Sequence, residues 1–150
     1  HAEPVEKLTR YEALLERYAD DPAAAWPTIA PVLFASSFLD DPARAADVQA
    51  QRAAFVANDG PTIRRAAAPI LRRVGIEHLL AHVRCPTLAV VGEFDAANPR
   101  PHAEHIVAGI AGAHLAVLPG VGHQPNAEAP EALASLIRGF VRASTQPSTP

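Results

Sequence analysis

The sequence has few of the residues that mark several large classes of protein. It contains one cysteine, Cys85, so it cannot form an internal disulfide, which fits the reducing cytoplasm. No apolar run approaches the roughly 20 residues that a membrane-spanning helix needs. The net charge of -3 and the scattered arginines argue against the concentrated basic face of a nucleic-acid-binding protein. We therefore expect a cytoplasmic protein that binds neither membranes nor nucleic acid.

Methionine is also absent, and the chain begins at His1, so the sequence as given does not begin at a translational start. Its 150 residues, of which 49% are hydrophobic and 19% charged, match the size and composition of one globular domain. Two explanations are open: initiating residues were removed, or the chain is a piece of a longer polypeptide. The missing nucleophile described below favours a piece.

The composition changes near residue 83, and the part before it is predicted to be mostly helical. Residues 1–82 are rich in Ala, Arg, Leu and acidic residues, and over 5–19 the apolar positions recur at spacings of three and four. Asp21 and Asp41 each precede a proline, the pattern of an N-cap followed by proline in the first turn. Pro27 and Pro31 predict an irregular stretch. Helices are predicted over 5–19, 42–57 and 61–73. A further helix is predicted to begin at 22, and a short helix to run through 81.

The second part, 83–142, has the pattern of an α/β protein. Two short apolar runs with β-branched residues, 86–91 and 114–118, are typical of buried parallel strands. A helix is predicted after each strand, over 101–110 and 130–141, which indicates right-handed crossovers between parallel strands. Two strands are too few for a stable open sheet, so we expect something outside this chain to complete it.

A carboxylate and an imidazole follow the two predicted strands. Asp95 lies three residues after Gly92, where the first strand ends. His123 lies five residues after Leu118, where the second strand ends. The carboxyl ends of parallel strands share one edge, so these side chains become neighbours although they are 28 residues apart in sequence. A carboxylate orients an imidazole that takes a proton from a nucleophile, so we predict two members of a hydrolytic triad.

These motifs together resemble the C-terminal end of the α/β-hydrolase family. The segment CPTLAVVGEFDAANP matches the family's strand that ends in Gly-x-x-Asp. The segment HLAVLPGVGHQPNAEAPEAL matches its Pro-Gly-x-Gly-His loop and the Glu-x-Pro-Glu stretch that opens the last helix. By that resemblance Asp95 is the triad acid, His123 is the base, and Glu128 has a structural role at the start of the last helix. The detailed likeness covers residues 76 to 142.

The resemblance also implies a domain arrangement and a substrate class. Residues 1–82 would be the helical cap that such enzymes insert between strands, and 83–142 the last part of the α/β core. The tail, 143–150, is mostly Ser, Thr, Pro and Gln and is predicted to be disordered. The closest likeness is to small esterases and lactonases, including enol-lactonase-like enzymes. It implies a carboxylic ester or lactone as substrate and no cofactor.

Further residues are candidates for contact with that substrate. In the cap they are the aromatic residues Trp26, Phe34 and Phe38, whose alternative role is a buried interface within the cap. Beside the acid they are Phe94 and Asn98, whose alternative role is packing of the loop. Two pairs of histidines at helical spacing lack a third ligand, so we predict no metal site.

The sequence departs from the family in lacking a nucleophile. The family's Gly-x-Ser-x-Gly elbow precedes the cap, and none of the serines here has that setting. We therefore expect a chain that is inactive alone. The N-terminal portion of the same hydrolase, covalently linked or separate, would complete the sheet, or a second copy would do so. Two alternatives stay open: a piece of a dehalogenase or epoxide hydrolase with an aspartate nucleophile, and a non-catalytic binding module on a degenerate hydrolase fold.

Overall fold

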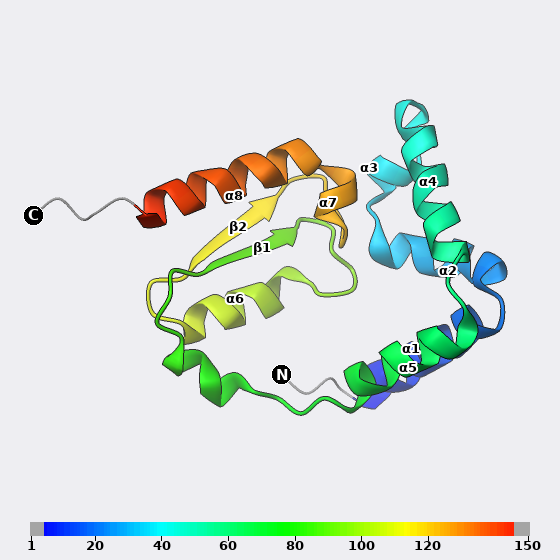
Figure 1. Ribbon diagram of the computed structural model, residues 1–150, viewed down its shortest axis with the longest axis horizontal. Helices are drawn as coiled ribbons and strands as arrows, with labels where there is room; N and C mark the ends of the chain where they lie inside the picture. Colours follow the sequence, from blue (N-terminus) through cyan, green and yellow to red (C-terminus); the bar gives the residue numbers. More distant parts are fainter. Residues whose placement is uncertain (1–4, 146–150) are drawn as a thin grey trace, which may run out of the picture.

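The computed structural model describes residues 5–145, which form a small sheet with its helices beside a separate group of helices (Figure 1). The elements are α1 (Val5–Asp20), α2 (Pro22–Leu33), α3 (Ser36–Leu39), η1 (Pro42–Arg44), α4 (Ala45–Val56), α5 (Gly60–Arg72), η2 (Glu77–His82), β1 (Leu88–Gly92), α6 (Arg100–Gly109), β2 (His114–Leu118), α7 (Pro125–Glu128) and α8 (Pro130–Thr145). We call α1 to α5 the cap, and β1, β2, α6 and α8 the core. The predicted fold class, a helical region followed by two parallel strands with crossover helices, is confirmed.

The core is a parallel sheet between two helices. Within the described residues it has two strands, which pair from Leu88 opposite His114 to Gly92 opposite Leu118. Helix α6 connects the strands and lies on one face of the sheet, whereas α8 lies over the other face (Figure 1). The apolar, β-branched runs favour strands here because their side chains pack on both faces. The parallel order places the carboxyl ends of both strands at one edge, next to the cap.

The cap packs around its own apolar centre. Ala30, Phe34 and Phe38 are its buried cluster, with exposed fractions of 3 to 5%. Helix α1 lies along α5 (Figure 1). Their close approach requires Gly60, because a β-carbon there would lie 2.1 Å from the carbonyl oxygen of Ala19. The cap is therefore a packed unit, and its inner end meets the loops that follow the strands.

Helix α2 is continuous, and the prediction of an irregular stretch at Pro27 and Pro31 was wrong. Each proline lacks the N–H of an internal helical hydrogen bond, so the carbonyls of Ala23 and Pro27 lose their helical donors. Ala23 and both prolines are exposed, so water can satisfy those carbonyls. The buried Ala25 and Ala30 of the same helix pack in the cap and hold the helix in place.

Two other segments differ from the sequence prediction. Helix α8 continues through Thr145, so residues 143–145 of the predicted disordered tail are helical, and 146–150 lie outside the described residues. The short 3-10 helix η2 packs against α6, so these last residues of the predicted helical region lie with the core. In the part of the chain that the structure describes, no helix is long and apolar enough to cross a bilayer.

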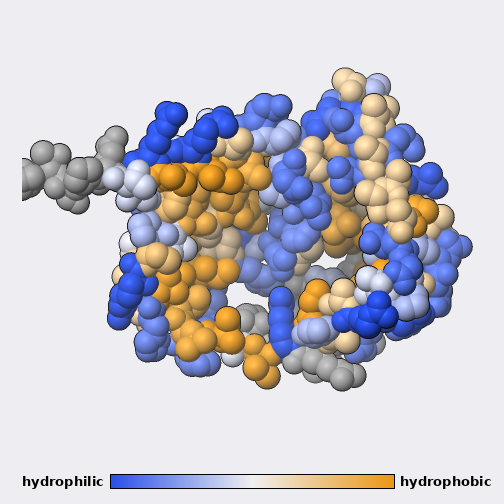
Figure 2. Space-filling model, in the orientation of Figure 1, coloured by the Kyte–Doolittle hydropathy of each residue, from blue (hydrophilic) through white to orange (hydrophobic). Residues whose placement is uncertain are grey.

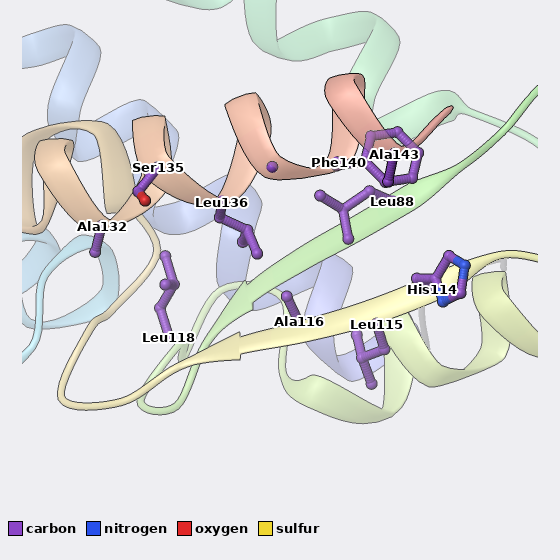
Figure 3. Close-up of a pocket in the computed structure, with 11 residues that line it drawn as sticks. Leu88, His114, Leu115, Ala116, Leu118, Ala132, Ser135, Leu136, Phe140 and Ala143 are labelled. Atoms are coloured by element: carbon purple, nitrogen blue, oxygen red, sulfur yellow. The ribbon is translucent and has the colours of Figure 1, made fainter. Parts of the chain in front are cut away.

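The core leaves part of its apolar surface uncovered. Figure 2 shows hydrophobic residues gathered over the sheet and the adjoining side of α8. An apolar groove of about 750 Å³ lies between them, shown in close-up in Figure 3. Leu88 and Leu118 of the strands and Leu136 and Phe140 of α8 line this groove. Each of the two described strands also has one edge with no neighbouring strand.

Candidate active site

Asp95, the predicted acid, lies in a short loop that follows β1, residues 93–99, which we call the acid loop. The ladder of the sheet continues beyond the strand, since Glu93 N–H donates to the carbonyl of Leu118 and Phe94 N–H donates to that of Val121. Gly92 lets the two chains approach, because a β-carbon there would lie 2.1 Å from the carbonyl oxygen of Gly122. These contacts fix the direction in which the loop of residues 93–99 leaves the sheet.

The carboxylate of Asp95 is itself oriented within this acid loop. Asn98 N–H donates to Asp95 Oδ1 at 2.7 Å, an Asx-type turn that holds the side chain against its own backbone. The Asp95 side chain is only 8% exposed. A second tie comes from the cap, where the hydroxyl of Tyr11 in α1 donates to the carbonyl of Ala97 at 3.1 Å.

His123, the predicted base, lies in the loop that follows β2, residues 119–124, which we call the histidine loop. Gly120 has φ 72°, a left-handed conformation that glycine adopts without strain and that turns the chain sharply after the strand. Gly120 N–H donates to the carboxylate of Glu93 at 2.8 Å, which ties the histidine loop to the acid loop. His123 N–H donates to the carbonyl of Leu33 at 3.0 Å, which ties it to the end of α2.

The two loops bring Asp95 and His123 into direct contact. His123 Nδ1 lies 2.9 Å from Asp95 Oδ2 and 3.1 Å from Oδ1. An ionised carboxylate only accepts hydrogen bonds, so Nδ1 carries the proton and donates. The lone pair of the other ring nitrogen, Nε2, is then available as a proton acceptor. The His123 side chain is 29% exposed, so the ring can be reached from outside.

Glu128 has a larger part in the site than its predicted role at the start of the last helix. It ends α7 and is 6% exposed, and its carboxylate accepts backbone hydrogen bonds from Ala35, Gly122 and Gln124. The two loop donors flank His123, and the third donor belongs to the cap. The Glu-x-Pro-Glu stretch at residues 128–131 marked Glu128 in the sequence, but it does not reveal these partners.

The residues predicted to contact substrate lie in two places. Trp26, Phe34 and Phe38 form one aromatic group in the cap, with ring centroids 5.9 Å apart for the first pair and 5.3 Å for the second. Phe34 and Phe38 are buried there, so they serve the interior of the cap. Phe94 is 58% exposed and Asn98 is also exposed, both beside Asp95. Contact of any of the five with a substrate stays a prediction.

The described part of the site holds a carboxylate–imidazole pair and no cluster of metal ligands. Among the residues described, no three His, Cys, Asp or Glu side chains lie close enough together to hold a metal ion. Among the serines that the structure describes, none is hydrogen-bonded to Asp95 or His123, and Ser37 donates its hydroxyl to the carbonyl of Gly120 at 2.7 Å. The arrangement can orient an imidazole whose free ring nitrogen accepts a proton.

Comparison with known proteins identifies the fold. No protein-family model and no curated protein matches this sequence. Among solved structures, a thermophilic esterase from Thermogutta terrifontis is 25% identical with a TM-score of 0.83, covering 97% of this chain and 54% of the esterase. An α/β-hydrolase from a deep-sea metagenome library is 17% identical with a TM-score of 0.78, covering 99% of this chain and 55% of that one.

The similarity extends to an enol-lactonase. The enzyme from Burkholderia xenovorans is 18% identical with a TM-score of 0.76, and the match covers 85% of this chain and 48% of the lactonase. The chain therefore has the α/β-hydrolase fold in part, and it spans about half the length of the proteins it matches. The expected likeness to the C-terminal part of esterases and of an enol-lactonase is confirmed at the level of fold.

Proposed function

We propose that this chain supplies the acid and the base of a Ser-His-Asp triad in a hydrolase of carboxylic esters or lactones. The observation that carries the proposal is the contact between His123 Nδ1 and Asp95 Oδ2, 2.9 Å long, at the carboxyl edge of two parallel strands. The fold shared with an esterase and an enol-lactonase supports the substrate class. The serine and the oxyanion-hole amides belong to the remaining part of the enzyme.

In this mechanism His123 transfers one proton in each of two half-reactions, first from the serine and then from water. His123 Nε2 takes the proton of the serine hydroxyl while the serine oxygen attacks the carbonyl carbon of the ester or lactone. The imidazolium, stabilised by Asp95, then gives that proton to the alkoxide that leaves as the acyl–oxygen bond breaks. A water molecule repeats both steps on the acyl-enzyme, which releases the carboxylic acid and regenerates the serine.

The uncovered surface of the core supports a further element of the proposal, which is that the N-terminal half of the hydrolase packs here. β1 is the strand that ends at the acid loop, so a parallel strand added at its free edge would place its own carboxyl end beside that loop. The apolar groove between the sheet and α8 would be covered in the same step. Burial of that surface would drive the association.

The test is reconstitution of the complete enzyme. This chain is co-expressed with the polypeptide encoded directly upstream, and hydrolysis of p-nitrophenyl butyrate and of γ-butyrolactone is measured. We expect activity that falls by on the order of 10⁶-fold in His123→Ala. His82→Ala is the matched control, because His82 is an exposed histidine in η2, at the opposite end of the strands from the triad residues.

Each outcome bears on the proposal. Labelling of an upstream serine by a fluorophosphonate probe, together with loss of hydrolysis in His123→Ala, supports it. Activity without serine labelling would replace the serine by an aspartate nucleophile. A stable complex that hydrolyses neither substrate would favour a non-catalytic binding module, and full activity in His123→Ala would overturn the assignment of the base.

A further inference from the structure

The strongest feature that the proposed mechanism does not use is the carboxylate of Glu128. It is the one buried polar or charged residue among those described, with an exposed fraction of 6%. Its Oε2 accepts the N–H of Gly122 at 2.9 Å and that of Ala35 at 2.9 Å. Its Oε1 accepts the N–H of Gln124 at 3.1 Å. Gly122 and Gln124 are the two residues on either side of His123.

Only a carboxylate of this length satisfies the arrangement. Three N–H donors converge on two oxygens that accept and do not donate. In Glu128→Gln one oxygen becomes an NH₂ group, which would meet at least one backbone N–H donor to donor. In Glu128→Asp the carboxylate is withdrawn by one methylene and cannot reach Ala35 and Gln124 together. A buried N–H left without an acceptor is costly, so either change would move the backbone.

The carboxylate also joins the base to the cap. Its third donor, Ala35, lies 93 residues away in sequence, between Phe34 and α3. The backbone of α7 is fastened to the cap separately, because the guanidinium of Arg44 donates to the carbonyls of Ala127 and Glu128, each at 3.0 Å. Glu128 therefore fixes the loop on both sides of His123 by its side chain, whereas Arg44 reaches the same turn without touching the amides beside the histidine.

We propose that Glu128 is a positioning residue for the base. It holds the backbone at Gly122 and Gln124, and it sets the position of the His123 ring relative to both Asp95 and the cap. The inference rests on the proposed triad. A misplacement of about 1 Å can cost on the order of 10²-fold in rate, so loosening this loop lowers kcat far more than it raises KM.

The experiment compares Glu128→Gln with Glu131→Gln in the reconstituted hydrolase. Glu131 is an exposed glutamate in the first turn of α8 and is the matched control. With p-nitrophenyl butyrate we expect kcat to fall by about 10²-fold in Glu128→Gln, with KM changed by less than about threefold, and no change in the control. Arg44→Met should lower the unfolding temperature and leave kcat within about threefold of the starting enzyme.

A spectroscopic readout separates this inference from the proposed function. The low-field proton NMR signal of His123 Nδ1–H, hydrogen-bonded to Asp95, reports ring placement whether or not the enzyme turns over. We expect the signal in the starting protein and its broadening or loss in Glu128→Gln. If Glu128→Gln keeps both signal and kcat, or if Arg44→Met lowers kcat as much, the positioning role is overturned. If Glu128→Gln fails to fold, Glu128→Asp takes its place, and normal kcat there would overturn the role equally.

Discussion

Replacing Gly122 with alanine would add a methyl group to the joint between the histidine loop and the cap. The new β-carbon would lie 2.5 Å from the backbone nitrogen of Ala35 and 2.8 Å from the backbone carbon of Phe34. It would also lie 3.0 Å from Glu128 Oε1. Two of these three neighbours are backbone atoms of the cap, which cannot rotate away as a flexible side chain can.

The size of the effect follows from how far the histidine loop and the cap must move apart to make room for the methyl group. Ordinary contact begins at 3.4 Å, so the loop and the cap must part by 3.4 - 2.5 = 0.9 Å along the closest contact. Overpacking of this kind costs about 1–3 kcal/mol, and a displacement near 1 Å beside a catalytic group costs on the order of 10²-fold in rate. That factor corresponds to about 2.7 kcal/mol of transition-state stabilisation.

The assay measures kcat with p-nitrophenyl butyrate and the unfolding temperature by calorimetry, both in the reconstituted hydrolase. The control is Gly112→Ala, at the turn before β2. There a β-carbon meets nothing within 4 Å, but φ is 73°, so alanine is strained by about 1–2 kcal/mol. Both variants should unfold at lower temperature, and only Gly122→Ala should lose kcat. Equal kcat in the two variants would refute the reasoning that this joint sets the position of the base.

Three other predictions concern the acid, the groove and a helix cap. Asp95→Asn should lower kcat by about 10⁴-fold with little change in KM, because an amide no longer fixes the tautomer of the ring; steady-state kinetics tests this. Leu136→Glu places a charge in the apolar groove and should prevent association with the N-terminal half, seen by sedimentation. Hydrogen bonds from Thr62 hold the pKa of Asp59 below its usual value. Its contribution to stability is therefore full above the unfolded-state pKa of about 3.9 and is lost as the pH falls through the lower folded-state value. The difference in unfolding temperature between the starting protein and Asp59→Asn should accordingly shrink from pH 7 to about pH 2, followed by circular dichroism.

The two strands were largely predictable from the sequence, because short apolar runs with β-branched residues favour buried parallel strands. β2 has the predicted bounds, 114–118. β1 begins at Leu88, two residues later than predicted. Pro86 has no N–H to donate to a ladder, whereas the carbonyl of Thr87 still accepts from His114 N–H at 2.9 Å. The positions of Asp95 and His123 after the two strands were likewise sufficient to predict that their side chains would lie in contact.

The hydrogen bond between Glu128 and the cap was not predictable, for a physical reason. A local pattern reports the environment of a residue through its neighbours in sequence, and Ala35 lies 93 positions away. The continuity of α2 was missed for a related reason, since it depends on which side of the helix Pro27 and Pro31 occupy. Both features are decided by tertiary packing. The resemblance could suggest a structural glutamate and propensity a helix breaker, but neither could show how the residue is packed.

The contacts between cap and core bear on the order in which the site forms. The acid loop is tied to α1 through Tyr11, and the histidine loop is tied to the end of α2 through the carbonyl of Leu33 and through Glu128. Every one of these partners lies in this chain. These contacts orient the imidazole from within this chain, so a nucleophile supplied by the proposed N-terminal half would meet a ring whose tautomer and direction are already set. In the proposed enzyme, such preorganisation would lower the reorganisation needed during reaction.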